Sequence, residues 1–123
     1  MEHLTQQEET AMRRLWALGD GTVKDLLEQY DEPVPPYTTL ASVVKNLERK
    51  GYVRARRVGN TYLYAPAVSE ADYKRHGLRR MVSNYFGNSY KEMVSFFVRE
   101  EHLSASELEE LVQLIKQQEN DAL

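Results

Sequence analysis

The strongest constraint on the fold is a change of hydrophobic period near residue 51. Over residues 38–50, apolar side chains recur at the spacing of an amphipathic helix. The apolar face of this expected helix comprises Leu40, Val43, Val44 and Leu47. Gly51 follows as a C-terminal cap, and two runs rich in β-forming residues, 52–57 and 61–65, then flank a turn at residues 58–60. The pattern predicts a helix followed directly by a β-hairpin, which Pro66 closes.

Two helices are expected before this pair. Thr5 and Glu8 have the spacing of a capping box and open a first helix, in which Trp16 is expected to be a core residue. Thr22 is expected to cap a short second helix. Three prolines within residues 33–36 cannot lie inside a helix, so they predict a rigid loop before the third helix.

Three more helices are expected after the hairpin. The first begins at about Ser69 and reaches about Phe86, and Asn88 is expected to cap the second. Ser104 and Glu107 form another capping box, which opens the last helix. The expected order is three helices, a hairpin and three further helices.

Positive charge is concentrated in the segment that contains the third helix and the hairpin. The whole chain carries a formal net charge of −3. Residues 37–66 nevertheless contain six basic side chains and one acidic one, whereas residues 1–36 and 67–123 are both net negative. A local positive patch attracts phosphate more strongly than the total charge suggests. This segment is therefore the candidate nucleic-acid surface.

The polar face of the third helix offers the side chains that a duplex groove requires. Short hydroxyls and a methyl group allow close approach, and amides and cations pair with base edges or phosphates. Basic residues of the hairpin can reach phosphates or a neighbouring minor groove. The candidate DNA-binding residues are Thr38, Thr39, Ala41, Ser42, Lys45, Asn46, Arg49, Arg54, Arg56, Arg57 and Asn60. The competing interpretations are a solvated helix face and a hairpin that uses charge to resist edge aggregation.

The tyrosines of the hairpin have two interpretations. Tyr52, Tyr62 and Tyr64 could stack on bases, as in proteins that bind single strands. We expect core packing instead. Tyr62 and Tyr64 have the same parity on one strand, so both are expected to project inward.

The C-terminal helices carry more apolar surface than three short helices can enclose. Such an excess predicts contact with a second copy of the chain. The residues expected in this dimer interface are Tyr73, Leu78, Met81, Val82, Tyr85, Phe86, Met93, Val94, Phe97, Leu108, Leu111, Val112 and Ile115. A monomeric bundle packed on the first domain is the alternative.

These elements together predict a mainly α protein with a small β-hairpin wing. We expect a winged helix-turn-helix DNA-binding domain over residues 1–68 and a three-helix dimerisation domain over residues 69–123. In this architecture the third helix enters the major groove and the hairpin is the wing beside it. Two other functions stay open: a winged-helix protein-interaction module without DNA binding, and a DNA-binding regulator that senses a small molecule directly.

Enzyme chemistry and metal binding find no support in the sequence. The chain has no cysteine, so it cannot form disulfides or thiolate metal sites, and its three histidines lack partners at metal-ligand spacing. No nucleophile and base, phosphate-binding glycine loop or membrane-spanning apolar run is evident, and the polar N-terminus does not resemble a signal peptide. We therefore expect a cytoplasmic, non-enzymatic protein that requires no cofactor or metal and does not insert into membranes.

Several motifs, in order and without gaps, carry a resemblance to a known family. They comprise Leu4, Thr5, Glu8, Met12, Leu15 and Trp16, the segments 37–42, 47–51, 59–66 and 69–73, and Met93, Val94, Phe97, Leu103 and Ser104. From Leu4 to about Gln118, the chain resembles the penicillinase repressors of the β-lactamase and methicillin-resistance systems. The wing 59–66 is similar to the family's Gly-Arg-x-Phe-x-Tyr-x-Pro.

This resemblance implies a homodimeric transcriptional repressor of the antibiotic-response type. Such a repressor binds a palindromic operator in double-stranded DNA, with its recognition helices in successive major grooves. It also implies proteolytic inactivation through a membrane-bound sensor protease system, with Phe96–Phe97 as the matching bond. The chain departs from the family pattern at Tyr37, Asn46 and Asn60, so the operator sequence does not carry over. It also lacks the cysteine-rich tail of the copper-responsive branch.

Overall fold

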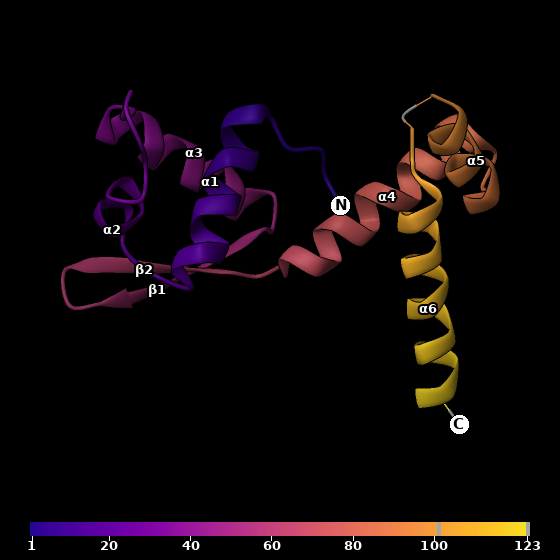
Figure 1. The fold of residues 1–123 in the computed structure, drawn as a ribbon. Helices are drawn as coiled ribbons and strands as arrows, with labels where there is room; N and C mark the ends of the chain where they lie inside the picture. Colours follow the sequence, from indigo (N-terminus) through magenta and orange to yellow (C-terminus); the bar gives the residue numbers. More distant parts are fainter. Residues whose placement is uncertain (101, 123) are drawn as a thin grey trace. The chain divides into compact units, whose positions relative to one another are not determined.

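The computed structural model describes residues 1–100 and 102–122, and its contacts divide the chain into two compact units, Met1–Gly77 and Leu78–Leu123. The elements of the first unit are α1 (Gln6–Leu18), α2 (Val23–Leu27), α3 (Tyr37–Arg49), β1 (Val53–Val58) and β2 (Thr61–Pro66). α4 (Glu70–Phe86) begins in the first unit and ends in the second, which also contains α5 (Tyr90–Glu100) and α6 (Ala105–Asp121) (Figure 1). This order confirms the predicted mainly α fold with a β-hairpin.

Side-chain caps determine where most of the helices begin. Thr5 and Glu8 form the predicted capping box of α1, and the Thr5 amide donates to the Glu8 carboxylate at 2.8 Å. Thr22 and Ser104 head the equivalent boxes of α2 and α6. Each box satisfies amides that the first turn of a helix otherwise leaves without a partner.

The predicted cap of α5 is wrong by one residue. The Ser89 hydroxyl, not the Asn88 side chain, accepts a hydrogen bond from the Glu92 amide at 3.1 Å. Asn88 instead adopts φ +66°, a left-handed conformation that asparagine tolerates better than most residues. It therefore belongs to the turn that follows α4.

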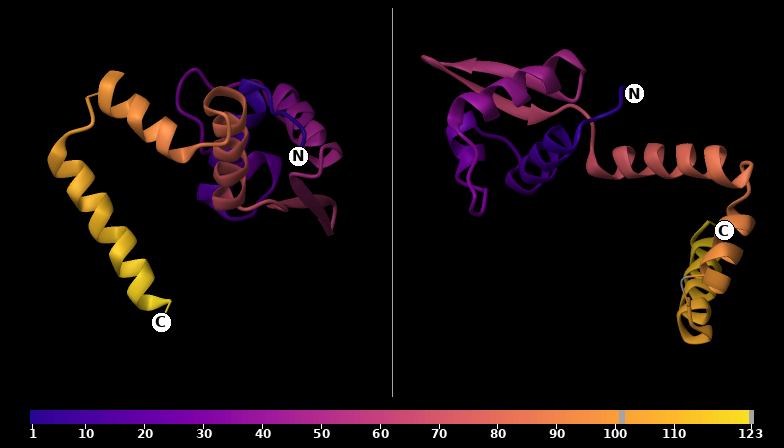
Figure 2. Two further views of the ribbon diagram at one scale, coloured as in Figure 1. Left: turned by 90° about the vertical axis from the view of Figure 1, so that its right-hand side faces the viewer. Right: turned by 90° about the horizontal axis from the view of Figure 1, so that it is seen from above.

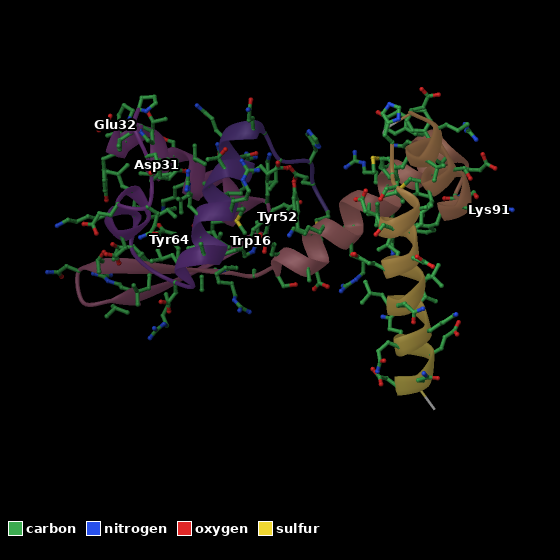
Figure 3. All side chains as sticks on the ribbon, viewed as in Figure 1. Trp16, Asp31, Glu32, Tyr52, Tyr64 and Lys91 are labelled. Carbon is green, nitrogen blue, oxygen red and sulfur yellow. The ribbon has the colours of Figure 1, made fainter. Side chains whose placement is uncertain are left out.

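The core of the first unit lies between its three helices and the base of the hairpin. The buried side chains from these elements are Ala11, Met12, Leu15, Val23, Leu26, Leu40, Val43, Val44, Leu47, Tyr52, Val53 and Tyr64. Trp16 packs at the edge of this core, as expected, and its indole N–H donates to the Val68 carbonyl at 2.9 Å (Figure 3). Burial of these apolar groups is the main stabilising contribution.

The hairpin is attached to the helices at its base. Its register runs from the pair Val53↔Pro66 to the pair Val58↔Thr61, which leaves a two-residue turn. Gly59 occupies the first turn position with φ +61°, as two-residue hairpin turns with glycine there require. Gly21 and Tyr64 exchange backbone hydrogen bonds of 3.0 and 2.8 Å at the base. The turn end projects beyond the helices of the first unit in all three views (Figures 1 and 2).

The first unit includes the beginning of α4, so it ends later than the expected boundary at residue 68. The Tyr73 ring packs against Trp16 and Tyr52, with centroid distances of 5.5 and 5.9 Å. Its hydroxyl donates to the Glu9 carboxylate at 2.6 Å. Burial and this hydrogen bond raise the pKa of Tyr73 above its ordinary value.

The second unit encloses little of its own apolar surface. Val82 and Met93 are buried, and the Phe86 and Phe96 rings meet edge to face at 5.7 Å. No described residue of α6 is buried, and most of this helix extends away from α5 as a single rod (Figure 2). Among the described residues, no helix is both long and apolar enough to cross a bilayer.

Candidate nucleic-acid interface

α3 turns one face to the core and the opposite face to solvent. Its four predicted apolar residues are all buried. The opposite face consists of the exposed residues Thr38, Thr39, Ser42, Lys45, Asn46 and Arg49, with the half-buried Ala41 at its flank. The hydrophobic period thus predicted the orientation of α3 correctly. The role of the exposed residues in DNA recognition stays a prediction.

The exposed face of α3 carries small hydroxyl side chains in its N-terminal half and cations in its C-terminal half. Thr38 and Ser42 provide short hydroxyls in the N-terminal half, which allow a groove wall to approach the backbone closely. The C-terminal half carries Lys45 and Arg49. The Arg49 guanidinium donates to the Asn46 side-chain oxygen at 3.4 Å, so the Asn46 amide nitrogen points away from this contact.

The hairpin divides its three arginines between two faces. Side chains alternate along a strand, and residues directly opposite in the register share a face. Arg57 therefore shares its face with its partner Tyr62, and with Val53 and Tyr64 nearer the core. Arg54 and Arg56 project from the other face. Arg57 thus lies on the face of the hairpin that packs on the core at its base, whereas Arg54 and Arg56 lie on the opposite face.

Tyr62 corrects the expectation that both tyrosines of β2 project into the core. Tyr64 is only 6% exposed, whereas Tyr62 is 46% exposed although it lies on the same face. Tyr62 lies two residues nearer the turn than Tyr64, and it does not belong to the core cluster. Lys45 of α3 lies beside it, with its Nζ 5.9 Å from the ring centroid. The signal that could have revealed this exposure is the charged cross-strand partner, Arg57.

The burial of Tyr64 shifts the pKa of its hydroxyl. Burial raises the pKa of its hydroxyl, and Glu48 acts in the same direction, while Lys45 opposes them. The net effect is a raised pKa, so Tyr64 stays a neutral packing residue.

Most basic side chains of α3 and the hairpin form no ion pair with an acidic side chain in the described part of the chain. Among residues 1–100 and 102–122, no carboxylate lies within ion-pair distance of Lys45, Arg49, Arg54, Arg56 or Arg57. The exception in the basic segment is Lys50, which bonds to Glu8 at 2.7 Å and is largely buried. Lys45 and Arg49 on α3 and Arg57 on one face of the hairpin can attract a polyanion, and Arg54 and Arg56 extend the positive charge to the other face of the hairpin.

The expected dimer residues occupy three kinds of position. Tyr73 packs inside the first unit, and Val82 and Met93 are buried inside the second. Phe86 and Leu108 are half-buried. The remaining residues are exposed: Leu78, Met81, Tyr85, Val94, Phe97, Leu111, Val112 and Ile115. The structure therefore leaves a large apolar surface uncovered in the described part of the second unit.

The expected cleavage bond and the histidines lie at the surface of the described chain. Phe96 and Phe97 lie inside α5, and both side chains are exposed. His3, His76 and His102 are exposed. Within the described residues, no group of three or more histidine, aspartate or glutamate side chains could hold a metal ion.

Comparison with known proteins identifies a family match over most of the chain. The family described as penicillinase repressor matches residues 4–117. The penicillinase repressor of Bacillus licheniformis is 24% identical over 82 residues, which cover 67% of this chain and 64% of that protein. The methicillin resistance regulatory protein MecI of Staphylococcus aureus is 26% identical over 73 residues, or 59% of each chain. The alignments thus span less than two thirds of these relatives.

A solved structure shares the fold. The multiple antibiotic-resistance repressor (MarR) from Listeria monocytogenes superposes with a TM-score of 0.50 at 25% identity. The superposition covers 95% of this chain and 73% of that chain. The architecture is therefore a winged helix-turn-helix, as the order of elements predicted, with α3 as the counterpart of a recognition helix and β1–β2 as the wing.

Proposed function

This protein belongs to the penicillinase repressor family. From that membership we propose that it is not an enzyme but a homodimeric transcriptional repressor that binds double-stranded DNA. The observation that carries the proposal is the exposed face of α3 with its adjoining wing, where five cations lack acidic partners among the described residues. α3 lies in the major groove, and the wing contacts the flanking backbone. The protein acts in the cytoplasm.

The second unit supplies the dimer contact. Leu111 and Ile115, one turn apart on α6, are 45% and 55% exposed, and Val112 lies beside them. A large exposed apolar surface of this kind marks a site of protein–protein contact. Because two copies of one chain pair through identical patches, the dimer has twofold symmetry and binds a palindrome. Its half-sites lie about 34 Å apart, one turn of the double helix.

Release from DNA follows cleavage at Phe96–Phe97 by a sensor protease system. Cleavage there separates α6, with its exposed apolar face, from the rest of the chain. A helical bond does not fit a protease cleft, so α5 must unwind locally before the cut. In cells exposed to an inducing antibiotic, we expect a fragment that begins at Phe97. Intact chain in cells whose target genes are fully induced would contradict release by proteolysis.

Selection of binding sites from a random duplex pool tests the proposed function. We expect the full-length chain to enrich two inverted half-sites. A Lys45→Glu, Arg57→Glu variant should enrich nothing, because it reverses two charges on the proposed surface. Lys91→Glu is the control for a charge reversal outside α3 and the wing, since Lys91 lies on α5 (Figure 3). Failure of the wild type to enrich any sequence would favour a protein-interaction module.

A further inference from the structure

Tyr62 is a large aromatic residue that the fold leaves in solvent beside the proposed DNA-binding face. Its 46% exposure contrasts with the burial of Tyr64 on the same face of β2. Tyr62 is also absent from the core and from the apolar residues packed against it. Packing therefore does not account for an aromatic side chain at this position.

One cation lies near the Tyr62 ring, and a second is its partner on the neighbouring strand. Lys45 Nζ from α3 is 5.9 Å from its centroid, within the range of a cation–π interaction. Arg57 is its cross-strand partner and shares its face of the hairpin. The Arg57 Nε donates to the Gly59 carbonyl at 3.2 Å, which leaves both terminal amino groups of the guanidinium for another acceptor. We call Lys45, Arg57 and Tyr62 the helix–wing seam.

This seam has the chemistry of a phosphate site. It offers an ammonium, a guanidinium and a phenol, all of which donate hydrogen bonds to phosphate oxygens in protein–DNA complexes. No carboxylate among the described residues pairs with either cation. An anion between the two cations would also relieve their mutual repulsion.

We propose that Lys45, Arg57 and Tyr62 bind one and the same backbone phosphate of the DNA, at the point where the recognition helix meets the wing. The Tyr62 hydroxyl donates to this phosphate, and its ring restrains the Lys45 ammonium. The shared contact fixes the wing relative to α3 on the duplex. This inference rests on the proposed DNA-binding function and adds Tyr62 to the residues assigned to it.

A methylphosphonate scan tests the proposal directly. In a duplex that carries the selected site, each phosphate in turn is replaced by a neutral methylphosphonate, and the affinity of the full-length chain is measured. The wild type should lose affinity at several positions. Lys45→Gln, Arg57→Gln and Tyr62→Phe should each abolish most of the loss at one common position and leave the others unchanged. On the unmodified duplex, Tyr62→Phe should bind about three- to tenfold more weakly, as the loss of one hydrogen bond predicts.

Tyr90→Phe is the matched control, because Tyr90 has nearly the same exposure, 47%, and lies on α5, outside α3 and the wing. It should behave as the wild type does at every position. The proposal is overturned if Tyr62→Phe keeps the full wild-type pattern, or if the three variants relieve different positions. The underlying function fails separately: then the wild type itself shows no binding and no sensitive phosphate.

Discussion

The Lys50 ammonium donates a 2.7 Å hydrogen bond to the Glu8 carboxylate, with side-chain exposures of only 12% and 4%. Lys50 also donates to the His3 carbonyl at 3.0 Å, while Glu8 completes the capping box of α1. The pair joins the N-terminal end of α1 to the C-terminal end of α3. Lys50 is therefore a structural residue, although it lies in the basic segment that supplies the proposed DNA-binding surface.

Removal of one partner of this pair should destabilise the first unit. In a Glu8→Ala variant, the largely buried Lys50 ammonium keeps the His3 carbonyl but loses its anionic partner, and the Thr5 amide loses its side-chain acceptor. We expect the free energy of unfolding to fall by about 2–3 kcal/mol. Urea denaturation measures it, with Glu28→Ala, an exposed glutamate at the end of α2, as a control expected to change by less than about 0.5 kcal/mol. Equal effects of the two substitutions would contradict the role of the pair.

The same pair predicts a component of acid sensitivity. Burial raises the pKa of Glu8, but hydrogen bonds from Lys50 and Thr5 outweigh it, so the pKa falls below its ordinary value of 4.5. The folded state then binds fewer protons than the unfolded state. The stabilisation from Glu8 is therefore full above pH 4.5 and is lost as the pH falls through the folded-state pKa.

Urea unfolding of the wild type and of Glu8→Gln at several pH values between 7 and about 3 measures this component. The difference in stability between the two proteins should shrink on acidification. A difference that stays constant over this range would mean that Glu8 does not titrate in the native state as its surroundings predict.

Cations that contact phosphates should set the salt dependence of DNA binding. We expect Lys45→Ala and Arg56→Ala each to weaken binding to many duplexes and to reduce the slope of log K against log salt by about 0.9. Fluorescence anisotropy titrations at several salt concentrations give this slope. If both variants kept the wild-type slope, their side chains would not contact phosphates.

Short polar residues of α3 should determine sequence preference instead. Ser42 and Asn46 lie on its exposed face, where they can pair with base edges. Substitution of either by alanine should change discrimination among half-sites by about 1–3 kcal/mol if a direct base contact is lost. Selection from a random pool compares the preferred sites, and an unchanged motif in both variants would argue against direct contact.

The apolar face of α6 should hold the dimer together. Leu111→Glu or Ile115→Glu introduces a charge into the proposed interface, which should convert dimers to monomers at micromolar concentration and weaken operator binding. Sedimentation equilibrium measures the mass. Gln117→Glu adds the same charge outside the apolar face and should leave the dimer intact. A dimer that survives both apolar substitutions would place the contact elsewhere.

Local sequence patterns predicted most of the fold, because the ends and the buried faces of helices are determined by residues close together in the chain. The period of the apolar residues predicted which face of α3 is buried, and two capping-box signals and the N-cap residue Thr22 predicted where α1, α6 and α2 begin. At α5, two adjacent residues were suitable caps. In the turn after α4, Asn88 adopts a left-handed backbone conformation, and Ser89 caps α5 instead.

The remaining features depend on distances that a local pattern does not contain. Strand parity predicted the face of Tyr62, but its burial depends on how far the hairpin extends beyond the helices. The Glu8–Lys50 pair joins residues 42 positions apart. Tyr73 packs on Trp16 and Tyr52, more than 50 and 20 positions away in the chain, because the first turns of α4 belong to the first unit.

The most direct test of the central claim is a salt titration of the purified protein binding the duplex upstream of its own gene, with the solution mass determined in parallel. The account predicts a dimer that protects a palindrome and whose affinity falls steeply as salt rises. A monomer, or a dimer that binds neither this duplex nor random DNA at low salt, would contradict it. The cationic surface of α3 and the wing would then serve solubility rather than recognition.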